Sequence, residues 1–427
     1  MLKSIIKYSF IFLVSVLAVY QFNDTIAQLR LIPKGIIKII FPEKKTKPSV
    51  KSDNKDKQIE IVNANSFEVH FQKIDYFSGY NKDEDGKINL QHKSSALYGF
   101  KKNDKTILEL YTRNGFLITK QGIKRFKLPN SFDSHNSAGG IRGIFYINEE
   151  RYAFLATIKI GCQNVSIINL DRNKEIFNSD CLPDYQEIHY DGIGGASIHI
   201  EDNILLSIGA PTNSSQQIRD LAQKDNSFYG KIILINKKNI QNFFKKNEKI
   251  KIKIYTKGHR NPQGLANIDN KFFSAEHGPK GGDEINILNE NKNYGWPISS
   301  YGTKYETLAT ANYKLNHLKN NFEEPLLQFT PSIAISDLTN CTQEMINYFN
   351  RKGCLLGTTL KEESLIVILL DHKLERVIGY ELIEFGERLR HFAKNFDGRL
   401  FTAKDDSIYI TSDSGEVYKV NFKFKKE

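Results

Sequence analysis

The sequence of 427 residues has no two cysteines in a C-x-x-C arrangement, no Trp-Asp repeat and only one tryptophan. Without a C-x-x-C pair, neither a cysteine zinc site nor a thioredoxin-like redox motif is indicated. The four cysteines favour two local disulfides, Cys162 with Cys181 and Cys341 with Cys354, and each would close a short loop. Four buried free thiols are the alternative.

The sequence also lacks a basic stripe suited to a nucleic acid backbone. Its formal net charge is +11 at pH 7, but residues 1–57 alone contain 11 Lys and Arg against 4 Asp and Glu. The remaining 370 residues therefore have a surplus of only +4. Because no basic run in that part alternates with aromatic residues, we expect no nucleic acid partner.

A long apolar run occurs only at the N-terminus. Lys3 and Lys7 precede the uncharged segment 8–22, and Asp24 ends it, an order typical of an export signal. Its length approaches the ~20 residues of a membrane span. We predict that residues 1–27 are a signal peptide or, in preference, an uncleaved signal anchor. The protein is then exported to the periplasmic or extracytoplasmic face and attached to the membrane through its N-terminal helix.

Residues 28–57 form the next predicted unit, an amphipathic segment followed by a polar linker. In 28–42, isoleucines and leucines alternate with Arg and Lys, so this part either lies along a membrane surface or docks as a short element. Residues 43–57 contain almost no apolar side chains and cannot offset the entropy of ordering. The folded domain is therefore predicted to span 58–427.

Within 58–427, apolar runs of about four to eight residues are bounded by Gly, Asn and Asp, and helical periodicity is scarce. Predicted strands include 151–160, 164–170, 231–236, 364–370 and 406–413, with turns at 371–373, 395–398 and 412–415 and short helices at 218–222 and 343–351. The pattern predicts an all-β fold. A six-bladed β-propeller accommodates this length best, and two tandem sandwiches are the alternative.

Two stretches are dense in Gly, Asn and charged residues, and they contain recognisable motifs. GHRNPQGLA at 258–266 is followed by SAEHGPKGGDEINILNENKNYGWPISSYG at 274–302, and GGASIHIEDNILLSIGA occupies 194–210. In this order and spacing, the motifs resemble the glucose/sorbosone dehydrogenase family of soluble quinoprotein aldose dehydrogenases. Similar segments at 139–147, 331–334, 355–361 and 388–401 extend the resemblance to the end of the chain.

The resemblance implies a six-bladed propeller that binds pyrroloquinoline quinone (PQQ) and calcium and oxidises an aldose sugar or related alcohol. The implied cofactor-binding residues are Arg260, Asn261, Lys361, Arg388 and Arg390. Their cationic members suit PQQ because this cofactor carries three carboxylates.

The resemblance also implies calcium ligands, the backbone carbonyls of Gly278 and Pro279. Calcium prefers such oxygen ligands. The nearby Asp283 and Glu284 are either further metal ligands or carboxylates that cap turns.

The sequence departs from the family at the catalytic base. The family places a His two residues before the Gly-Gly of the second stretch and a supporting Asp at its end, where this chain has Gly192 and Ala210. Neither residue accepts a proton. Asp191 and His189 are candidate substitutes, although strand alternation does not ensure that their side chains face the site.

Two functions therefore stay open. One is a PQQ-dependent sugar dehydrogenase-like oxidoreductase with an altered base, whose electron acceptor the sequence does not indicate. The other is a non-catalytic propeller that binds cofactor, sugar or a protein partner.

Overall fold

A computed structural model describes residues 49–51, 59–82, 93–128, 139–159, 162–182, 192–210, 215–303 and 317–425. The chain divides into two compact units, Met1–Lys47 and Pro48–Glu427, and all described residues belong to the second. The predicted signal segment 1–27 and nearly all of 28–57 lie outside the described residues. In the described ranges, no helix combines the length and apolar character needed to cross a membrane.

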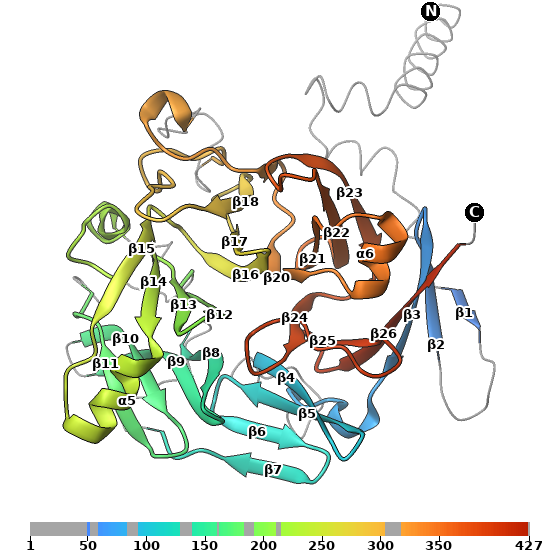
Figure 1. Cartoon of the computed structure of the whole chain (residues 1–427), viewed down its shortest axis with the longest axis horizontal. Helices are drawn as coiled ribbons and strands as arrows, with labels where there is room; N and C mark the ends of the chain where they lie inside the picture. The colour runs from blue at the N-terminus through green and yellow to red at the C-terminus, as the bar shows by residue number, and fades with distance from the viewer. Residues whose placement is uncertain are drawn as a thin grey trace, which may run out of the picture. The chain divides into compact units, whose positions relative to one another are not determined.

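The described body is all-β, as predicted, and most of its strands lie in four-stranded antiparallel sheets (Figure 1). The first contains β8 (Gly140–Ile147), β9 (Glu150–Lys159), β10 (Cys162–Asn169) and β11 (Lys174–Asn178). The second contains β12 (Gly194–Ile200), β13 (Asn203–Ile208), β14 (Lys231–Asn236) and β15 (Ile252–Lys257). The third contains β16 (Pro262–Ile268), β17 (Lys271–Glu276), β18 (Asp283–Leu288) and β19 (Leu327–Phe329). The fourth contains β20 (Ile335–Asn340), β21 (Cys354–Thr359), β22 (Ser364–Leu370) and β23 (Val377–Glu384).

A ten-stranded sheet combines the two ends of the body in the order β1-β2-β3-β26-β25-β24-β4-β5-β6-β7. Its strands are β1 (Ser49–Lys51), β2 (Ile59–Asn63), β3 (Phe67–Lys73), β4 (Ser94–Lys102), β5 (Lys105–Thr112), β6 (Phe116–Thr119), β7 (Gly122–Arg125), β24 (Leu389–Lys394), β25 (Ile408–Ser412) and β26 (Val417–Phe424). β24 and β4 are parallel and paired at only two positions, whereas the other neighbours in this sheet are antiparallel. The sheet thus divides naturally at this short junction.

The first strand of each four-stranded sheet lies toward a common centre, together with β4 and β24 (Figure 1). Around this centre, β4 contacts β8, β8 contacts β12, and the contacts continue through β16, β20 and β24 back to β4. The ends of these inner strands are therefore close enough to build one site from distant parts of the sequence.

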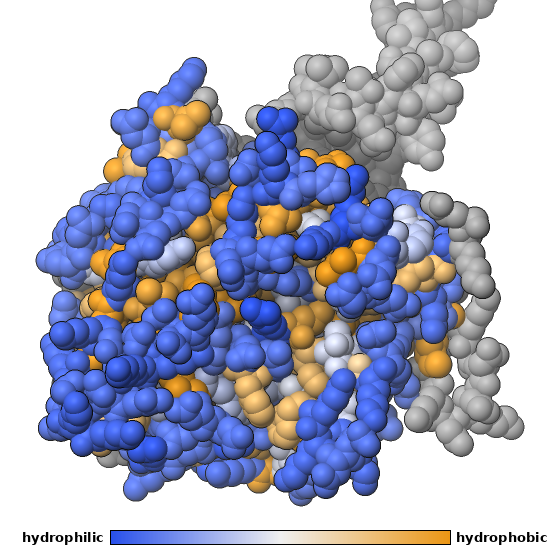
Figure 2. All heavy atoms as spheres, in the orientation of Figure 1, coloured by the Kyte–Doolittle hydropathy of each residue, from blue (hydrophilic) through white to orange (hydrophobic). Residues whose placement is uncertain are grey.

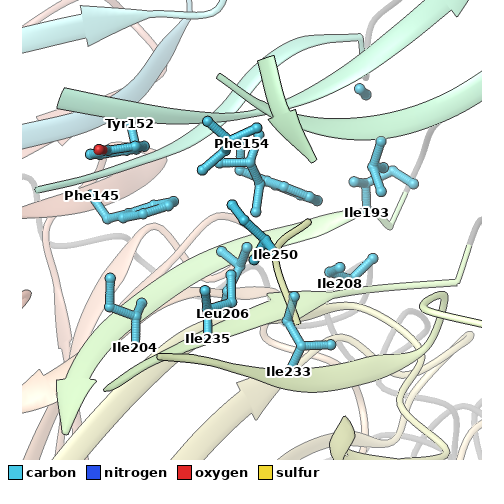
Figure 3. Close-up of a cluster of buried hydrophobic side chains, with 14 of the residues drawn as sticks. Phe145, Tyr152, Phe154, Ile193, Ile204, Leu206, Ile208, Ile233, Ile235 and Ile250 are labelled. Atoms are coloured by element: carbon cyan, nitrogen blue, oxygen red, sulfur yellow. The ribbon is translucent and has the colours of Figure 1, made fainter. Parts of the chain in front are cut away.

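The core lies between neighbouring sheets. In Figure 3, Phe145 and Phe154 of the first sheet point toward Ile204 and Leu206 of the second. Leu205, on the opposite face of β13, packs into a different cluster. Because both faces of such a strand are buried, its sequence is a continuous apolar run and does not alternate. Hydrophilic residues cover most of the visible outer surface (Figure 2).

The two predicted helices are confirmed, and a third was missed. Segment 218–222 overlaps α4 (Gln216–Arg219) and the 3-10 turn Asp220–Ala222, and segment 343–351 contains α6 (Gln343–Phe349). The missed helix is α5 (Lys237–Lys246), whose N-cap Asn236 accepts a hydrogen bond from the Lys238 N–H. Two further 3-10 turns, Asp75–Phe77 and Leu318–Asn320, were not predicted either.

Both predicted disulfides are present. The Cα atoms are 5.1 Å apart in Cys162–Cys181 and 5.3 Å apart in Cys341–Cys354. The described residues contain no free cysteine, so the alternative of buried thiols was wrong. The second bond joins the end of β20 to the start of β21 and braces the loop that contains α6.

A buried lysine stabilises the backbone close to a candidate site residue. The Lys231 side chain is fully buried, and its ammonium donates to the carbonyl oxygens of Leu221 (2.8 Å), Ala222 (2.9 Å) and Tyr229 (2.8 Å). Ala222 O also accepts from the N–H of Gly258, two residues before Arg260. The lysine thus connects β14 to the backbone around a candidate site residue.

We expect Lys231→Met to lower the free energy of unfolding by about 2–4 kcal/mol, because three buried carbonyls lose the hydrogen-bond donor that they share. Urea denaturation of the purified protein measures this change. Lys253→Met is the matched control, since Lys253 pairs with Glu290 and its side chain is 55% exposed; we expect a loss below about 1 kcal/mol. Equal stability of the two variants would show that the carbonyl contacts contribute nothing.

Candidate functional site

A cavity of about 650 Å³ opens where the inner strands meet, a volume typical of ligand sites. Among the described residues, five basic side chains but a single carboxylate line its walls. The lining residues are Arg142, Gly192, Arg260, Asn261, Gln263, His277, Gly278, Pro279, Lys280, Gly281, Asp283, Ser332, Ala334, Leu360, Lys361 and Arg390.

The structure brings together six of the seven described candidate residues. Arg260, Asn261, Lys361 and Arg390 line the cavity, as do Gly278 and Pro279. Arg388 is not among the lining residues, but it shares a partner with Arg390. The candidate bases Asp191 and His189 lie outside the described residues.

That shared partner is Asp413, a carboxylate that the sequence analysis placed only in a turn. Its Oδ1 is 2.5 Å from Arg390 Nε, and its Oδ2 is 3.0 Å from Arg390 Nη2. The same Oδ2 lies 3.2 Å from Arg388 Nε and 3.4 Å from Lys93 Nζ. Burial would raise the pKa of Asp413, but the three cations, Arg390 foremost, hold that pKa well below its usual value. One ionised carboxylate therefore positions a group of three cations.

Arg260 is held by the backbone and by the only tryptophan. Its Nη1 donates to the His277 carbonyl at 2.8 Å, and its guanidinium lies 5.4 Å from the ring centroid of Trp296. Trp296 packs in turn against Ala210 and Ala222 in a small buried cluster. The motif NYGWP thus supports, through Trp296, the motif RNPQG that lines the cavity.

The loop between β17 and β18 is shaped by Asp283. Its Oδ1 accepts from the N–H of Gly278 at 3.0 Å, and its Oδ2 accepts from the N–H of Ala334 at 2.6 Å. A Cβ atom at Gly278 would overlap the Gly282 carbonyl oxygen, so the loop requires glycine there. Asp283 therefore fixes the backbone at Gly278, one of the two candidate calcium ligands, which favours the turn-capping alternative for this carboxylate.

Glu284, the other carboxylate considered as a metal ligand, is buried behind the loop. It faces Glu276 across the β17–β18 pair, and burial followed by the charge of Glu276 raises its pKa well above the usual value. Glu276 in turn contacts His259 Nδ1 at 3.2 Å. In the described ranges, no three His, Cys, Asp or Glu side chains are grouped to hold a metal ion.

His277 lines the cavity but is engaged on one side, because its Nε2 lies 2.6 Å from the carbonyl oxygen of Ile335. A carbonyl only accepts hydrogen bonds, so Nε2 carries the proton. Burial is the largest cause that lowers the pKa of His277, and we conclude that the ring is neutral near pH 7.

The two departures from the family motif lie close together. Gly192 lines the cavity, and a Cβ atom at Gly209, the neighbour of Ala210, would overlap the Gly192 carbonyl oxygen. Ala210 is fully buried beside Trp296. Neither position offers a proton acceptor to the cavity.

Comparisons with known proteins agree with these motifs. The family model described as Glucose / Sorbosone dehydrogenase matches residues 155–411. The aldose sugar dehydrogenase YliI of Escherichia coli is 30% identical over 208 residues, 48% of this chain and 54% of that protein. An uncharacterized Synechocystis protein, slr1608, is 30% identical over 281 residues, 61% of this chain and 66% of that protein. The chain thus spans between about half and two thirds of the length of these curated relatives.

Solved structures show the same fold. The soluble aldose sugar dehydrogenase of Escherichia coli, in its apo form, aligns with a TM-score of 0.61 at 21% identity, covering 83% of this chain and 99% of that one. The PQQ-bound aldose sugar dehydrogenase of Streptomyces coelicolor aligns with a TM-score of 0.54 at 16% identity, covering 83% and 98%.

We expect Asp413→Asn to lower the free energy of unfolding by about 3 kcal/mol at pH 7, because it leaves the buried Arg390 guanidinium without its counter-charge. The pKa of Asp413 is lower in the folded than in the unfolded chain, so its contribution is complete above about pH 4 and disappears as the pH falls further. Denaturant unfolding at pH 7 and pH 3 should show a smaller difference between wild type and variant at pH 3.

The control is Asp405→Asn, because the Asp405 side chain is 54% exposed and pairs with Lys419 at the surface. We expect it to cost less than about 1 kcal/mol. A pH-independent loss in Asp413→Asn would contradict the assignment of an ionised, buried carboxylate.

Proposed function

The chain belongs to the glucose/sorbosone dehydrogenase family, and from this premise we propose that it is an oxidoreductase that oxidises a sugar or related alcohol with PQQ. The observation that supports this proposal most strongly is the cation-lined cavity, where family motifs from four sheets meet. The five basic residues and one carboxylate found among the described lining residues suit a polyanionic cofactor.

The residues present fit this group. Arg260, Lys361 and Arg390 are the cations that we propose hold the three carboxylates, and the Asn261 amide adds a hydrogen bond. When bound, PQQ supplies the chemistry of a hydride acceptor. The backbone carbonyl oxygens of Gly278 and Pro279 are the proposed calcium ligands, and the Asp283 carboxylate holds their loop in place.

We propose that the scaffold is a six-bladed propeller. Four blades are the four-stranded sheets, and the ten-stranded sheet supplies two more, divided at the short β24–β4 junction. β1 and β2 then extend the blade that contains β3. The circle of contacts among the inner strands supports this arrangement.

Loss of the family base requires another proton acceptor if the chain is an enzyme. Oxidation of a sugar hydroxyl releases a proton as well as a hydride, and neither Gly192 nor Ala210 can take it. Asp191, which precedes the cavity-lining Gly192 in the sequence, and His189 remain our proposed substitutes.

We propose that the protein works outside the cytoplasm, attached through residues 1–27. The two disulfides support this location because such bonds persist mainly in oxidising compartments.

A second candidate function is that of a non-catalytic propeller, which binds cofactor, sugar or a protein partner. It is favoured by the joint replacement of the family base and its supporting carboxylate at Gly192 and Ala210.

Titration of the full-length protein with PQQ and calcium, followed by quinone absorbance, tests the cofactor. We expect saturable binding, and Lys361→Ala should weaken it at least about tenfold because a charge-assisted contact is lost. Arg376→Ala, an exposed position on the β22–β23 turn, is the control and should bind as wild type does. Failure of the wild type to bind would reject the cofactor. Binding without reduction by any aldose would favour the non-catalytic alternative.

The substitute base is tested on the loaded protein. Replacing the acting base, by His189→Ala or Asp191→Asn, should lower the rate of sugar-dependent quinone reduction about 10²-fold or more while PQQ affinity is unchanged. Stopped-flow absorbance measures the rate. If both variants retain the wild-type rate, neither residue is the base.

A further inference from the structure

We infer that Asp337 is the group that receives the proton released when the sugar is oxidised, through water molecules in a polar channel that adjoins the cavity. This inference rests on the proposed function and names a further residue for its reaction. Asp337 acts through water and not by contact with the sugar, so its role differs from that of His189 or Asp191. The sequence analysis did not single it out.

The channel lies between the inner strands. It has a volume of about 50 Å³, and each of the strands β4, β8, β12, β16, β20 and β24 contributes residues to its wall. Arg142 and Gln263 line both this channel and the larger cavity, so the two spaces adjoin. β24 connects them as well, because Arg390 near its start lines the cavity and Lys394 at its end lines the channel.

The channel is suited to hold water. Its volume accommodates about three water molecules. The hydroxyl of Ser95, which lines the channel, is buried and has no hydrogen-bond partner among the described residues. Ser197 and Gln263 add further polar side chains to the wall. Ordered water normally satisfies buried polar groups of this kind, and here it would connect Asp337 to the cavity through hydrogen bonds.

Asp337 lies in the wall of this channel and is 5% exposed. Its Oδ1 accepts from the Leu338 N–H at 2.8 Å and lies 3.2 Å from the Lys394 ammonium. Its Oδ2 accepts from the Phe392 N–H at 3.0 Å. A carboxylate offers about four acceptor sites, so these three donors leave one site on Oδ2 for a proton.

The surroundings allow Asp337 to change its protonation state. Burial raises the pKa of Asp337, and Lys394 with the two backbone N–H groups offsets only part of this rise. The other titratable groups of the described wall are Tyr98, His391 and Arg142. Burial raises the pKa of Tyr98 and lowers that of His391 so far that both are neutral near pH 7. Asp337 is thus a stronger base than an exposed aspartate, and no other carboxylate lines the described part of the channel.

The proton needs such an acceptor because a cofactor and a sugar that fill the cavity exclude bulk water. Oxidation breaks a C–H bond of the sugar, whose hydride passes to the cofactor, and an O–H bond, whose proton enters the water chain. The chain delivers a proton to Asp337 Oδ2, where a new O–H bond forms. Gly192 has no side chain to separate the sugar from this water. A base at position 189 or 191 can pass its proton along the same chain.

The first test requires no turnover. Infrared spectra of the full-length wild type and of Asp337→Asn, recorded from about pH 4 to about pH 8, isolate the carboxyl band of Asp337 by difference. We expect this band to grow as the pH falls, with a midpoint above about 4, the usual value for aspartate. In heavy water the band should shift immediately, because channel water exchanges with solvent. A missing band, or one that shifts only when the protein unfolds, would overturn the inference.

Lys394→Gln tests the same carboxylate without removing it. The variant lacks the cation that favours ionised Asp337, so the infrared midpoint should rise by about one pH unit or more. Turnover requires ionised Asp337, so the pH below which turnover falls should rise by the same amount. Lys404→Gln is the control, because Lys404 is 63% exposed and pairs with Asp104 at the surface, and it should change neither value. A purely structural role for Asp337 would leave the pH profile of turnover unchanged in Lys394→Gln.

The second test uses the full-length protein loaded with PQQ and calcium, with D-glucose as the sugar and a phenazine dye as the electron acceptor. Asp337→Asn should lower turnover at pH 7 at least about tenfold, while PQQ affinity is unchanged. Without the dye, reduction of the quinone by glucose should add the protonated carboxyl band in the wild type but not in Asp337→Asn.

The outcomes separate this inference from the proposed function. If glucose reduces the bound quinone and turnover is equal in wild type and Asp337→Asn, the function stands and the inference is wrong. If PQQ does not bind or is not reduced, the infrared titration decides alone. A carboxyl band of Asp337 that titrates and exchanges with heavy water then supports a proton acceptor connected to the cavity, and its absence rejects one.

Discussion

The antiparallel pairing of β3 with β26 is the contact on which the arrangement of the sheets depends. It joins the first long strand of the body to its last strand, from Phe67 opposite Phe424 to Lys73 opposite Tyr418. The four-stranded sheets are each built from one continuous stretch of chain, so they could form without fixing the two ends. Only the sheet that contains β3 and β26 ties those ends together, at the entropic cost of closing a loop of more than 300 residues. Packing among Phe71, Phe385 and Tyr418 helps to offset that cost.

The same pairing places the electrostatic centre of the site. Asp413 lies in the turn between β25 and β26, and the N–H of Gly79, just after β3, donates to Gly415 of this turn. The carboxylate is thereby held within reach of Arg388, Arg390 and Lys93. Cations that converge in this way repel one another. The fixed Asp413 carboxylate offsets this repulsion, so that Arg390 can line the cavity in its charged form. Closing the fold and preorganising the site are therefore one structural event.

Local features were predictable from the sequence because they depend on nearby residues. β14 and β22 match their apolar runs at both ends, the two disulfides are between near neighbours in the sequence, and the motifs locate the cavity wall. Helix α5 was missed because it directly follows a strand and begins at an asparagine that also suits a turn. Asp413 was assigned to a turn because its partners lie 23 or more residues away, so spacing gives no signal. Arg142 resembles any strand residue until the contact of β8 with β12 fixes its surroundings.

The replacement at position 210 shows how apolar packing and charge are linked in this site. Ala210 is fully buried against Trp296, and the Trp296 ring lies beneath the Arg260 guanidinium. A carboxylate at position 210 would need a polar partner in this cluster, and the family pattern supplies one in the histidine that Gly192 replaces. Without that histidine, an alanine avoids an unpaired buried charge and allows Trp296 to pack closely. The two replacements are therefore expected to occur together, because either one alone would leave the other member of the histidine–carboxylate pair without its polar partner.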